Sequence, residues 1–184
     1  DVYKRQAYRH DDALTLRQQV RYGHIDLDAR YLSGAGLQPG TRLLNRNAWS
    51  VESSVQNVLV DNNAQVRVDT GNAKHQFLAG FDYQRLNWDQ GVGLLATGYP
   101  ALDLDNPKYG YVPGPTPPYN LVSVDQRNTQ YGVYLSDQVS IGNWRLNLGG
   151  RYDIAQLHSQ DRLNGGDPTR KKDNAFTWQA GALY

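Results

Sequence analysis

The stretch that decides the fold is residues 131–153, which read YGVYLSDQVSIGNWRLNLGGRYD. On each side of Gly142 and Asn143, apolar and polar residues alternate. This is the period of a β-strand, because successive side chains of a strand point to opposite faces. A break of two residues between two such runs predicts a hairpin with a tight turn. The chain therefore contains at least one pair of antiparallel strands.

The same alternation recurs on both sides of this hairpin. It covers residues 13–31, 58–69, 75–84 and 174–184. Within the first of these runs the apolar parity changes at Gly23, and a single glycine favours a β-bulge inside one long strand over a tight hairpin. We therefore expect an all-β chain with about six antiparallel strands.

The connections between these runs alternate strictly between short and long. The breaks at 70–74 and 142–143 are short, whereas those at about 33–54, 86–128 and 158–173 are long. Tight turns at one rim and long loops at the other are typical of outer-membrane β-barrels. Runs of about ten residues also match a tilted strand that crosses a bilayer, whereas strands of soluble proteins average about five or six.

The composition narrows the function classes. Thirteen Tyr, four Trp and three Phe favour strands, and 18 Gly favour turns and crowded walls. A net charge of +1 without a basic stripe argues against a nucleic acid partner, and the lack of cysteine excludes a disulfide framework and thiol chemistry. Two alternatives to a transport barrel stay open: a structural or adhesive barrel, and a soluble β-sandwich that acts as a binding module.

Two parts of the chain do not follow the alternating pattern. Residues 1–12 match no strand pattern, so we treat them as a leader or truncation scar outside a barrel segment at 13–184. Gln18 and Asp137 place polar groups on the apolar parity. Asp137 lies near its short turn, where an acid costs less than at the midplane, or a bulge rotates it inward.

Several stretches resemble TonB-dependent siderophore receptors, nearest to the ferrichrome type. They are LRQQVRY, VDTGNAKHQFLAGFDYQR, LDLDNP, and YGVYLSDQ followed by LNLGGRYD, and the likeness covers roughly residues 14–184. The resemblance implies an antiparallel transmembrane β-barrel of 22 strands in the bacterial outer membrane, filled by an amino-terminal plug. It implies that this chain supplies about six strands and has its long loops outside the cell.

The same resemblance implies the function. Such receptors bind a ferric siderophore at the outer mouth, and the TonB complex passes energy through the plug to release it into the periplasm. The plug, its energy-coupling box and the other strands are absent from these 184 residues. We therefore expect a transporter fragment that is not an enzyme, holds no cofactor of its own and is not competent alone.

Aromatic residues near the outer loops are the best ligand candidates, because rigid rings bury a large area at little entropic cost. The candidates are Tyr31, Trp88, Tyr99, Tyr109, Tyr111 and Tyr119. The alternative role for each ring is to anchor the membrane interface. We expect the long loop at 86–128 to fold over the barrel mouth. In the family an aromatic shortly after the strand ending near Tyr83 can face the ligand, whereas Leu94 and Leu95 stand there in this sequence, so the siderophore is not specified.

Other chemistry has little support in the sequence. The four histidines are scattered without a second ligand at useful spacing, so we predict no metal site, and no carboxylate pair suggests acid–base catalysis. One basic cluster stands out, Arg170, Lys171 and Lys172. It is either a solvated loop tip or a contact for anionic lipopolysaccharide or an anionic ligand. Outer-membrane lipid is a further expected partner, because the apolar faces of the strands would contact it.

Overall fold

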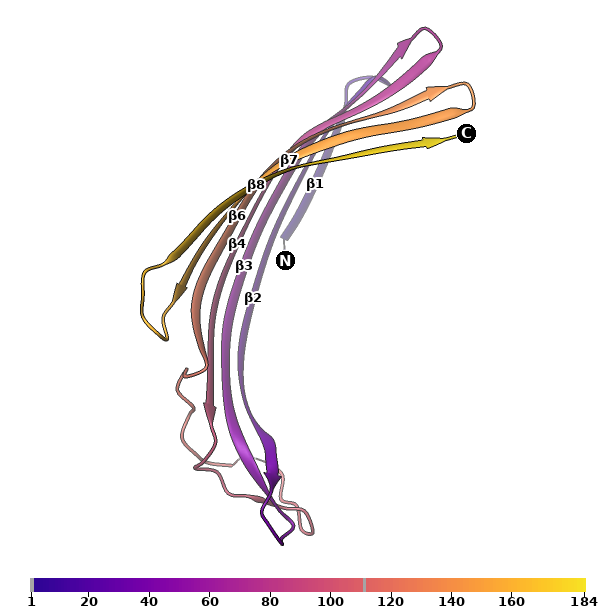
Figure 1. The fold of residues 1–184 in the computed structure, drawn as a ribbon. Helices are drawn as coiled ribbons and strands as arrows, with labels where there is room; N and C mark the ends of the chain where they lie inside the picture. The colour runs from indigo at the N-terminus through magenta and orange to yellow at the C-terminus, as the bar shows by residue number, and fades with distance from the viewer. Residues whose placement is uncertain (1, 111) are drawn as a thin grey trace.

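The computed structural model describes residues 2–110 and 112–184, which form a single antiparallel sheet (Figure 1). Seven long strands are hydrogen bonded in the order β1-β2-β3-β4-β6-β7-β8, and the two-residue strand β5 pairs with β3. No helix long and apolar enough to cross a membrane occurs in the described residues. The strands are β1 (Val2–Arg9), β2 (Leu14–Leu37), β3 (Leu43–Thr70), β4 (Ala73–Leu95), β5 (Leu102–Asp103), β6 (Val122–Ile141), β7 (Trp144–Asp161) and β8 (Thr169–Leu183).

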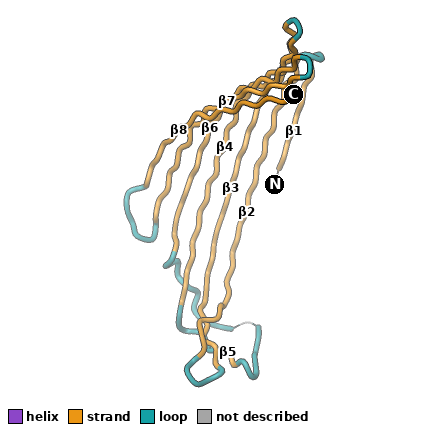
Figure 2. Tube along the Cα trace, turned by 45° about the vertical axis from the view of Figure 1, so that its right-hand side comes forward, coloured by secondary structure: helices purple, strands orange, loops and turns teal. Residues whose placement is uncertain are grey.

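The sheet confirms the predicted all-β antiparallel architecture. The six predicted strands correspond to β2, β3, β4, β6, β7 and β8. The described residues form one curved layer without a second sheet packed on it, so the soluble β-sandwich interpretation is wrong (Figure 2). Residues 2–9, which the sequence analysis left outside the fold, form β1 and pair with β2 from Val2↔Tyr22 to Arg9↔Thr15.

The strands are longer than predicted, and the long loops are correspondingly shorter. The predicted loop at 33–54 is mostly the outer hairpin of β2 and β3, 86–128 shrinks to 96–121, and 158–173 shrinks to 162–168. The extension of β2 and β3 was predicted as a loop because of the Gly and Pro residues in 33–40, and the extensions of β4 and β6 were missed because the alternation is lost there. Strand geometry persists there because each extension is paired with its neighbour along the backbone ladder.

Gly23 does not form a bulge. The β2–β3 register runs without a shift from Leu14↔Val66 to Gly34↔Arg46, and its one irregularity lies between Gly34 and Leu37. The predicted single long strand is therefore confirmed, and the bulge is wrong. Because no residue is inserted, the change of apolar parity at Gly23 is a true exchange of polarity between the two faces of the sheet.

Both short turns have two central residues, as predicted at 142–143 and within 70–74. Gly71 and Gly142 occupy the first central position of each turn, with φ of 61° and 57°. This left-handed backbone at the first position is the requirement of a type II′ hairpin turn, which glycine meets without a steric cost.

The two faces of the sheet differ along most of its length. We call the face that carries the cross-strand row Val20, Val60, Tyr83, Tyr131 and Ile154 the outer face, and the opposite face the inner face. Ala48 and Val139 are the buried hydrophobic residues among those described, so neither face has a core of its own. The apolar side chains of the outer face are left for a contact outside this chain.

The two polar residues that interrupt the outer face each have a partner on that face. Gln18 Nε2 donates to Asn62 Oδ1 at 2.7 Å, and the His75 Nδ1 to Asp137 Oδ2 distance is also 2.7 Å. The β6–β7 register is unbroken around Asp137, so no bulge rotates it inward. Pairing, together with a position near the short turn, lowers the cost of these polar groups on an apolar face.

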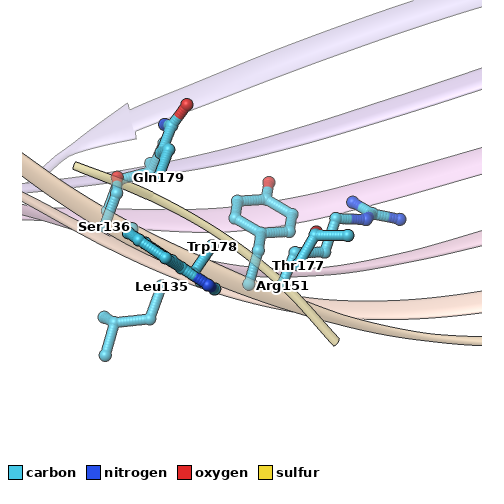
Figure 3. Close-up of a pocket in the computed structure, with 10 residues that line it drawn as sticks. Leu135, Ser136, Arg151, Thr177, Trp178 and Gln179 are labelled. Carbon is cyan, nitrogen blue, oxygen red and sulfur yellow. The ribbon is translucent and has the colours of Figure 1, made fainter. Parts of the chain in front are cut away.

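A charge on the outer face should destabilise the barrel more than the same charge on the inner face. Leu135 and Ser136 point to opposite sides of the sheet (Figure 3), and Leu135 lies midway between the Gly142 turn and Tyr131. If the outer face meets lipid, Leu135→Arg should lower the free energy of unfolding by about 2–4 kcal/mol. Ser136→Arg should cost much less, because it projects into the polar interior. Urea unfolding of the full-length barrel in lipid vesicles measures both, and equal losses would contradict this assignment.

Candidate functional site

The polarity of both faces exchanges at one level of the sheet. On the outer face the next row beyond Val20 and Ile154 is Tyr22, Val58, Arg85, Thr129, Gln156 and Lys172. The row after it is fully polar: His24, Gln56, Asn87, Arg127, His158 and Arg170. On the inner face the opposite change occurs, and polar residues give way to apolar ones. The level between these rows therefore marks where apolar side chains pass from the outer face to the inner face of the same strands.

The inner face beyond this level carries a wall of apolar and aromatic side chains. We call Ile25, Leu27, Tyr31, Trp49 and Trp88 the inner aromatic wall. Ile25, Leu27 and Tyr31 are 64%, 48% and 50% exposed, so the described residues leave this part of the wall largely uncovered. Exposed apolar patches of this kind mark binding surfaces.

The rings of the inner aromatic wall are fixed by their neighbours. Tyr31 stacks on Trp49 with a centroid distance of 6.1 Å and an interplanar angle of 10°. Trp49 Nε1 donates to Ser33 Oγ at 2.9 Å, and Trp88 Nε1 donates to Ser53 Oγ at 3.0 Å. Because the indole N–H groups are satisfied, the rings present apolar faces with little remaining freedom, as a binding wall requires.

The structure distributes the six predicted ligand residues over three places. Tyr31 and Trp88 belong to the inner aromatic wall. Tyr99 and Tyr109 lie in the loop at 96–121 and, with Tyr31, border a cavity of about 510 Å³ at the outer end of β2 and β3. Tyr119 packs on the outer face, and Tyr111 lies outside the described residues.

Trp49 is the wall residue that the sequence analysis did not find. It falls inside the stretch 33–54, which was predicted to be a loop. The signal was its parity with Val51 and Val55, an alternation in the opposite phase to the apolar residues of 58–69. Trp49 could be identified as a strand residue only if β3 was predicted to continue past the point, between Val58 and Val55, where its apolar residues change parity.

The loop at 96–121 is held against the outer face of β2, β3 and β4. Ser50 is 4% exposed and its hydroxyl donates to the Pro117 carbonyl at 2.8 Å, while the Arg46 guanidinium donates to the Pro100 carbonyl at 2.6 and 2.8 Å. The sequence analysis predicted that this loop covers the barrel mouth. Its described part lies across the outside of the wall instead.

Small residues on β4 make this contact possible. A Cβ on Gly93 would lie 2.2 Å from the Pro118 carbonyl oxygen, and one on Gly91 would lie 2.8 Å from the Tyr119 ring. The Tyr119 hydroxyl donates a hydrogen bond to the Glu52 carboxylate, which raises the pKa of Tyr119 above its usual value. Gly91 and Gly93 thus leave the space that Tyr119 and Pro118 occupy, and we call these two glycines the glycine contact of the loop.

Closer to the short turns, the inner face carries a satisfied network of charges. Arg151 contacts Asp82 and Asp153, each at 2.6 Å, and its guanidinium lies over Gly132. Tyr134 lies across Gly80, with its hydroxyl donating to Asp61 at 2.8 Å. Among the described residues there is no group of three potential metal ligands. This network braces the wall and has the features of a structural element.

A set of cations lies on the outer face just beyond the change of polarity. We call Arg85, Arg127, Arg170 and Lys172 the basic belt. Arg85 Nε and Arg127 Nε both donate to Asn87 Oδ1, at 3.3 and 3.2 Å. Arg170 and Lys172 lie within β8 and not at a loop tip, whereas Lys171 falls on the inner parity opposite Leu157.

Comparison with known proteins identifies relatives along the whole chain. The family described as TonB dependent receptor-like, beta-barrel matches residues 2–184. The Ferrioxamine B receptor of Salmonella typhimurium (strain LT2) is 34% identical over 175 residues, which are 95% of this chain and 24% of that receptor. The Ferrichrome outer membrane transporter/phage receptor of Escherichia coli K12 is 27% identical over 199 residues, covering 95% and 26%. The chain therefore spans about a quarter of these relatives.

Solved structures share the fold. The siderophore receptor PiuA from Acinetobacter baumannii superposes with a TM-score of 0.77 at 18% identity, covering 98% of this chain and 29% of that one. The closed form of the Ferric-Catecholate import receptor Fiu from E. coli K12 gives a TM-score of 0.77 at 20% identity, covering 99% and 30%. The sheet is thus a segment of a larger barrel wall, open at both edges.

A larger side chain at the glycine contact on β4 should displace the loop at 96–121. Gly93→Val places a branched side chain where the Pro118 carbonyl and the Ser50 hydroxyl now lie, so the loop has to move away. We expect faster amide hydrogen exchange across 96–121 in the full-length protein, measured by mass spectrometry. Gly166→Val is the matched control, because nothing lies within 4 Å of its Cβ position. Unchanged amide hydrogen exchange of residues 96–121 in Gly93→Val would contradict the packing of the loop on Gly93.

Proposed function

This chain belongs to the TonB-dependent receptor β-barrel family, and we propose that it forms part of the wall of an outer-membrane receptor for ferric siderophores. The observation that carries this proposal is the inner aromatic wall, which begins where the outer face changes from apolar to polar. Below that level the outer face suits lipid and the inner face suits water. Above it, apolar rings face the barrel interior in a region surrounded by water, where only a ligand or another part of the receptor covers them.

The chemistry of the wall favours a bulky ligand with little net charge. No Asp, Glu, Lys or Arg occupies the inner parity between Ile25 and Tyr31 or between Trp49 and Val55. Stacked rings supply contact area without ion pairing, which suits the organic shell of a chelate. Iron enters as cargo inside that chelate, and the wall supplies no ligand atom to the metal. The relatives named for ferrioxamine and ferrichrome are consistent with such a cargo.

Transport requires parts of the receptor beyond this segment. The family members are receptors, so we propose a role in uptake with no reaction catalysed by this wall. Release of the siderophore, driven by the TonB complex, would act through a plug that is separate from these strands. The contribution of this segment is to span the membrane and to hold one side of the ligand.

The basic belt supports a second partner, the anionic lipopolysaccharide of the surrounding outer leaflet. Its four cations lie on the outer face next to the last apolar row, at the height where lipid head groups begin. In the described residues no carboxylate lies within 4 Å of these four cations. Phosphate groups satisfy such guanidinium and ammonium groups well.

Removing the rings of the inner aromatic wall should weaken siderophore binding. The triple substitution Tyr31→Ala, Trp49→Ala and Trp88→Ala in the full-length receptor should raise the Kd for ferrioxamine B more than tenfold, which corresponds to about 1.4 kcal/mol. Fluorescence quenching or calorimetry measures the Kd. Trp144→Ala is the control, because Trp144 lies on the outer face beside the short turn. The proposal fails if the triple variant binds as the wild type does, or if Trp144→Ala weakens binding equally.

The two neighbouring lysines of β8 allow a matched test of the basic belt. Lys172→Gln should reduce the lipopolysaccharide retained by the purified receptor, because each cation near an anionic surface contributes about 1 kcal/mol. Lys171→Gln, which removes the same charge from the inner parity, should leave it unchanged. Quantifying bound lipid by mass spectrometry distinguishes them, and equal loss from both variants would rule out a face-specific contact.

A further inference from the structure

We propose that the cavity between the loop at 96–121 and the outer end of β2 and β3 is a binding site for an anionic saccharide, meaning a sugar ring that carries a phosphate or carboxylate group. The cavity measures about 510 Å³, which is within the range of small-ligand sites. Most of its strand lining lies on the outer parity, and Tyr31 and Trp49 of the inner aromatic wall border it from the inner parity. The proposal rests on Arg30, Arg46 and the loop, which are residues that the siderophore proposal does not use.

The strands supply the floor of this cavity. Its strand lining on the outer parity is Arg30, Leu32, Gly34, Leu44, Arg46 and Ala48. The loop supplies the roof, including Tyr99, Tyr109 and Thr116. The Ser50–Pro117 and Arg46–Pro100 hydrogen bonds hold roof and floor together. The site is thus preformed by contacts that are independent of a ligand.

The charge of the cavity is positive. Arg30 and Arg46 line it, and no Asp or Glu is among the described lining residues. Arg46 donates through Nε and Nη2 to one carbonyl, and Arg30 makes a long contact of 3.4 Å with Thr116 Oγ1. Neither guanidinium has a carboxylate within 4 Å in the described part of the chain, whereas Arg42 on the same hairpin is paired with Asp105. Two guanidinium groups without a counterion favour a phosphate or carboxylate ligand.

The rings of the roof suit a sugar. Tyr109 is 84% exposed, so its ring is available to a ligand that enters the cavity. Tyr99 is fixed by its hydroxyl, which donates to the Pro115 carbonyl at 2.7 Å, and its ring lies against Gly114. An amphipathic ring beside a cation matches a ligand that combines an apolar ring face with hydroxyl groups and an anion.

The location indicates what reaches the cavity. It opens beside the outer face, farther from the apolar rows than the basic belt is, so the molecules around it are the polar parts of the surrounding leaflet and solutes of the medium. An anionic saccharide is available from both sources, as the sugar chain of lipopolysaccharide or as a free sugar phosphate. The same cavity chemistry serves either one.

Calorimetry on the full-length receptor in detergent tests the proposal. The probes are the phosphorylated core oligosaccharide released from lipopolysaccharide, the same oligosaccharide after dephosphorylation, and glucose 6-phosphate. We expect the phosphorylated oligosaccharide to bind at least tenfold more tightly than its dephosphorylated form. Glucose 6-phosphate binding equally well would assign the site to free sugar phosphates, and its failure to bind would assign the site to the membrane saccharide. Either result supports an anionic saccharide site.

Three variants locate the binding. Arg30→Gln and Arg46→Gln should each weaken the phosphorylated oligosaccharide at least fivefold, and Tyr109→Ala should weaken both oligosaccharides. Lys108→Gln is the control, because it removes one positive charge from the same loop at a residue that does not line the cavity. The proposal is overturned if dephosphorylation has no effect, or if Lys108→Gln weakens binding as much as Arg46→Gln. Ferrioxamine B binding, measured in parallel, tests the siderophore proposal separately.

Discussion

The continuity of the backbone ladder is the constraint on which the rest of this structure depends. In an unbulged strand every second side chain stays on one face, whatever its chemistry. The β2–β3 pairing has no shift from Leu14 to Gly34, so Leu16 and Arg30 necessarily face the same side. On the proposed assignment, the change of polarity along that side reports a change in the surrounding medium. Lipid contact would end where His24 and Arg127 begin, the level at which apolar side chains pass to the inner face.

In the proposed receptor, strands that continue beyond the membrane form the binding surface. In lipid the ladder is obligatory, because no water satisfies the backbone there. Beyond the lipid the same ladder persists and presents Tyr31, Trp49 and Trp88 on a rigid scaffold instead of on mobile loops. The loop at 96–121 adds to this rigidity from the outer side, since Gly91 and Gly93 let it lie directly on the strands. The two proposed sites thus draw mainly on opposite faces of the same strands.

Sequence patterns predicted the elements whose chemistry is uniform and missed those whose chemistry changes midway. The hairpin around Gly142 follows from strict alternation and a turn glycine. The outer halves of β3 and β4 were read as loops, because Glu52 and Asp89 take the parity that apolar residues hold closer to the short turns, whereas β2 was predicted as a strand as far as Tyr31. Trp49 was lost for that reason. The position of Tyr119 on the outer face follows from long-range contacts with Glu52 and Gly91, which no local pattern contains.

The most direct test of this account is a scan of solvent along β4. The sequence has no cysteine, so single cysteines introduced from Phe77 to Asp89 can carry spin labels in the full-length receptor in liposomes. Accessibility to oxygen reports lipid, and accessibility to a nickel chelate reports water. The account predicts that odd-numbered positions switch from oxygen to nickel accessibility between Tyr83 and Arg85, with no lipid signal at Leu86 or Trp88. Lipid exposure that moved to these even-numbered positions would mean that the strand is bulged, and would contradict the account.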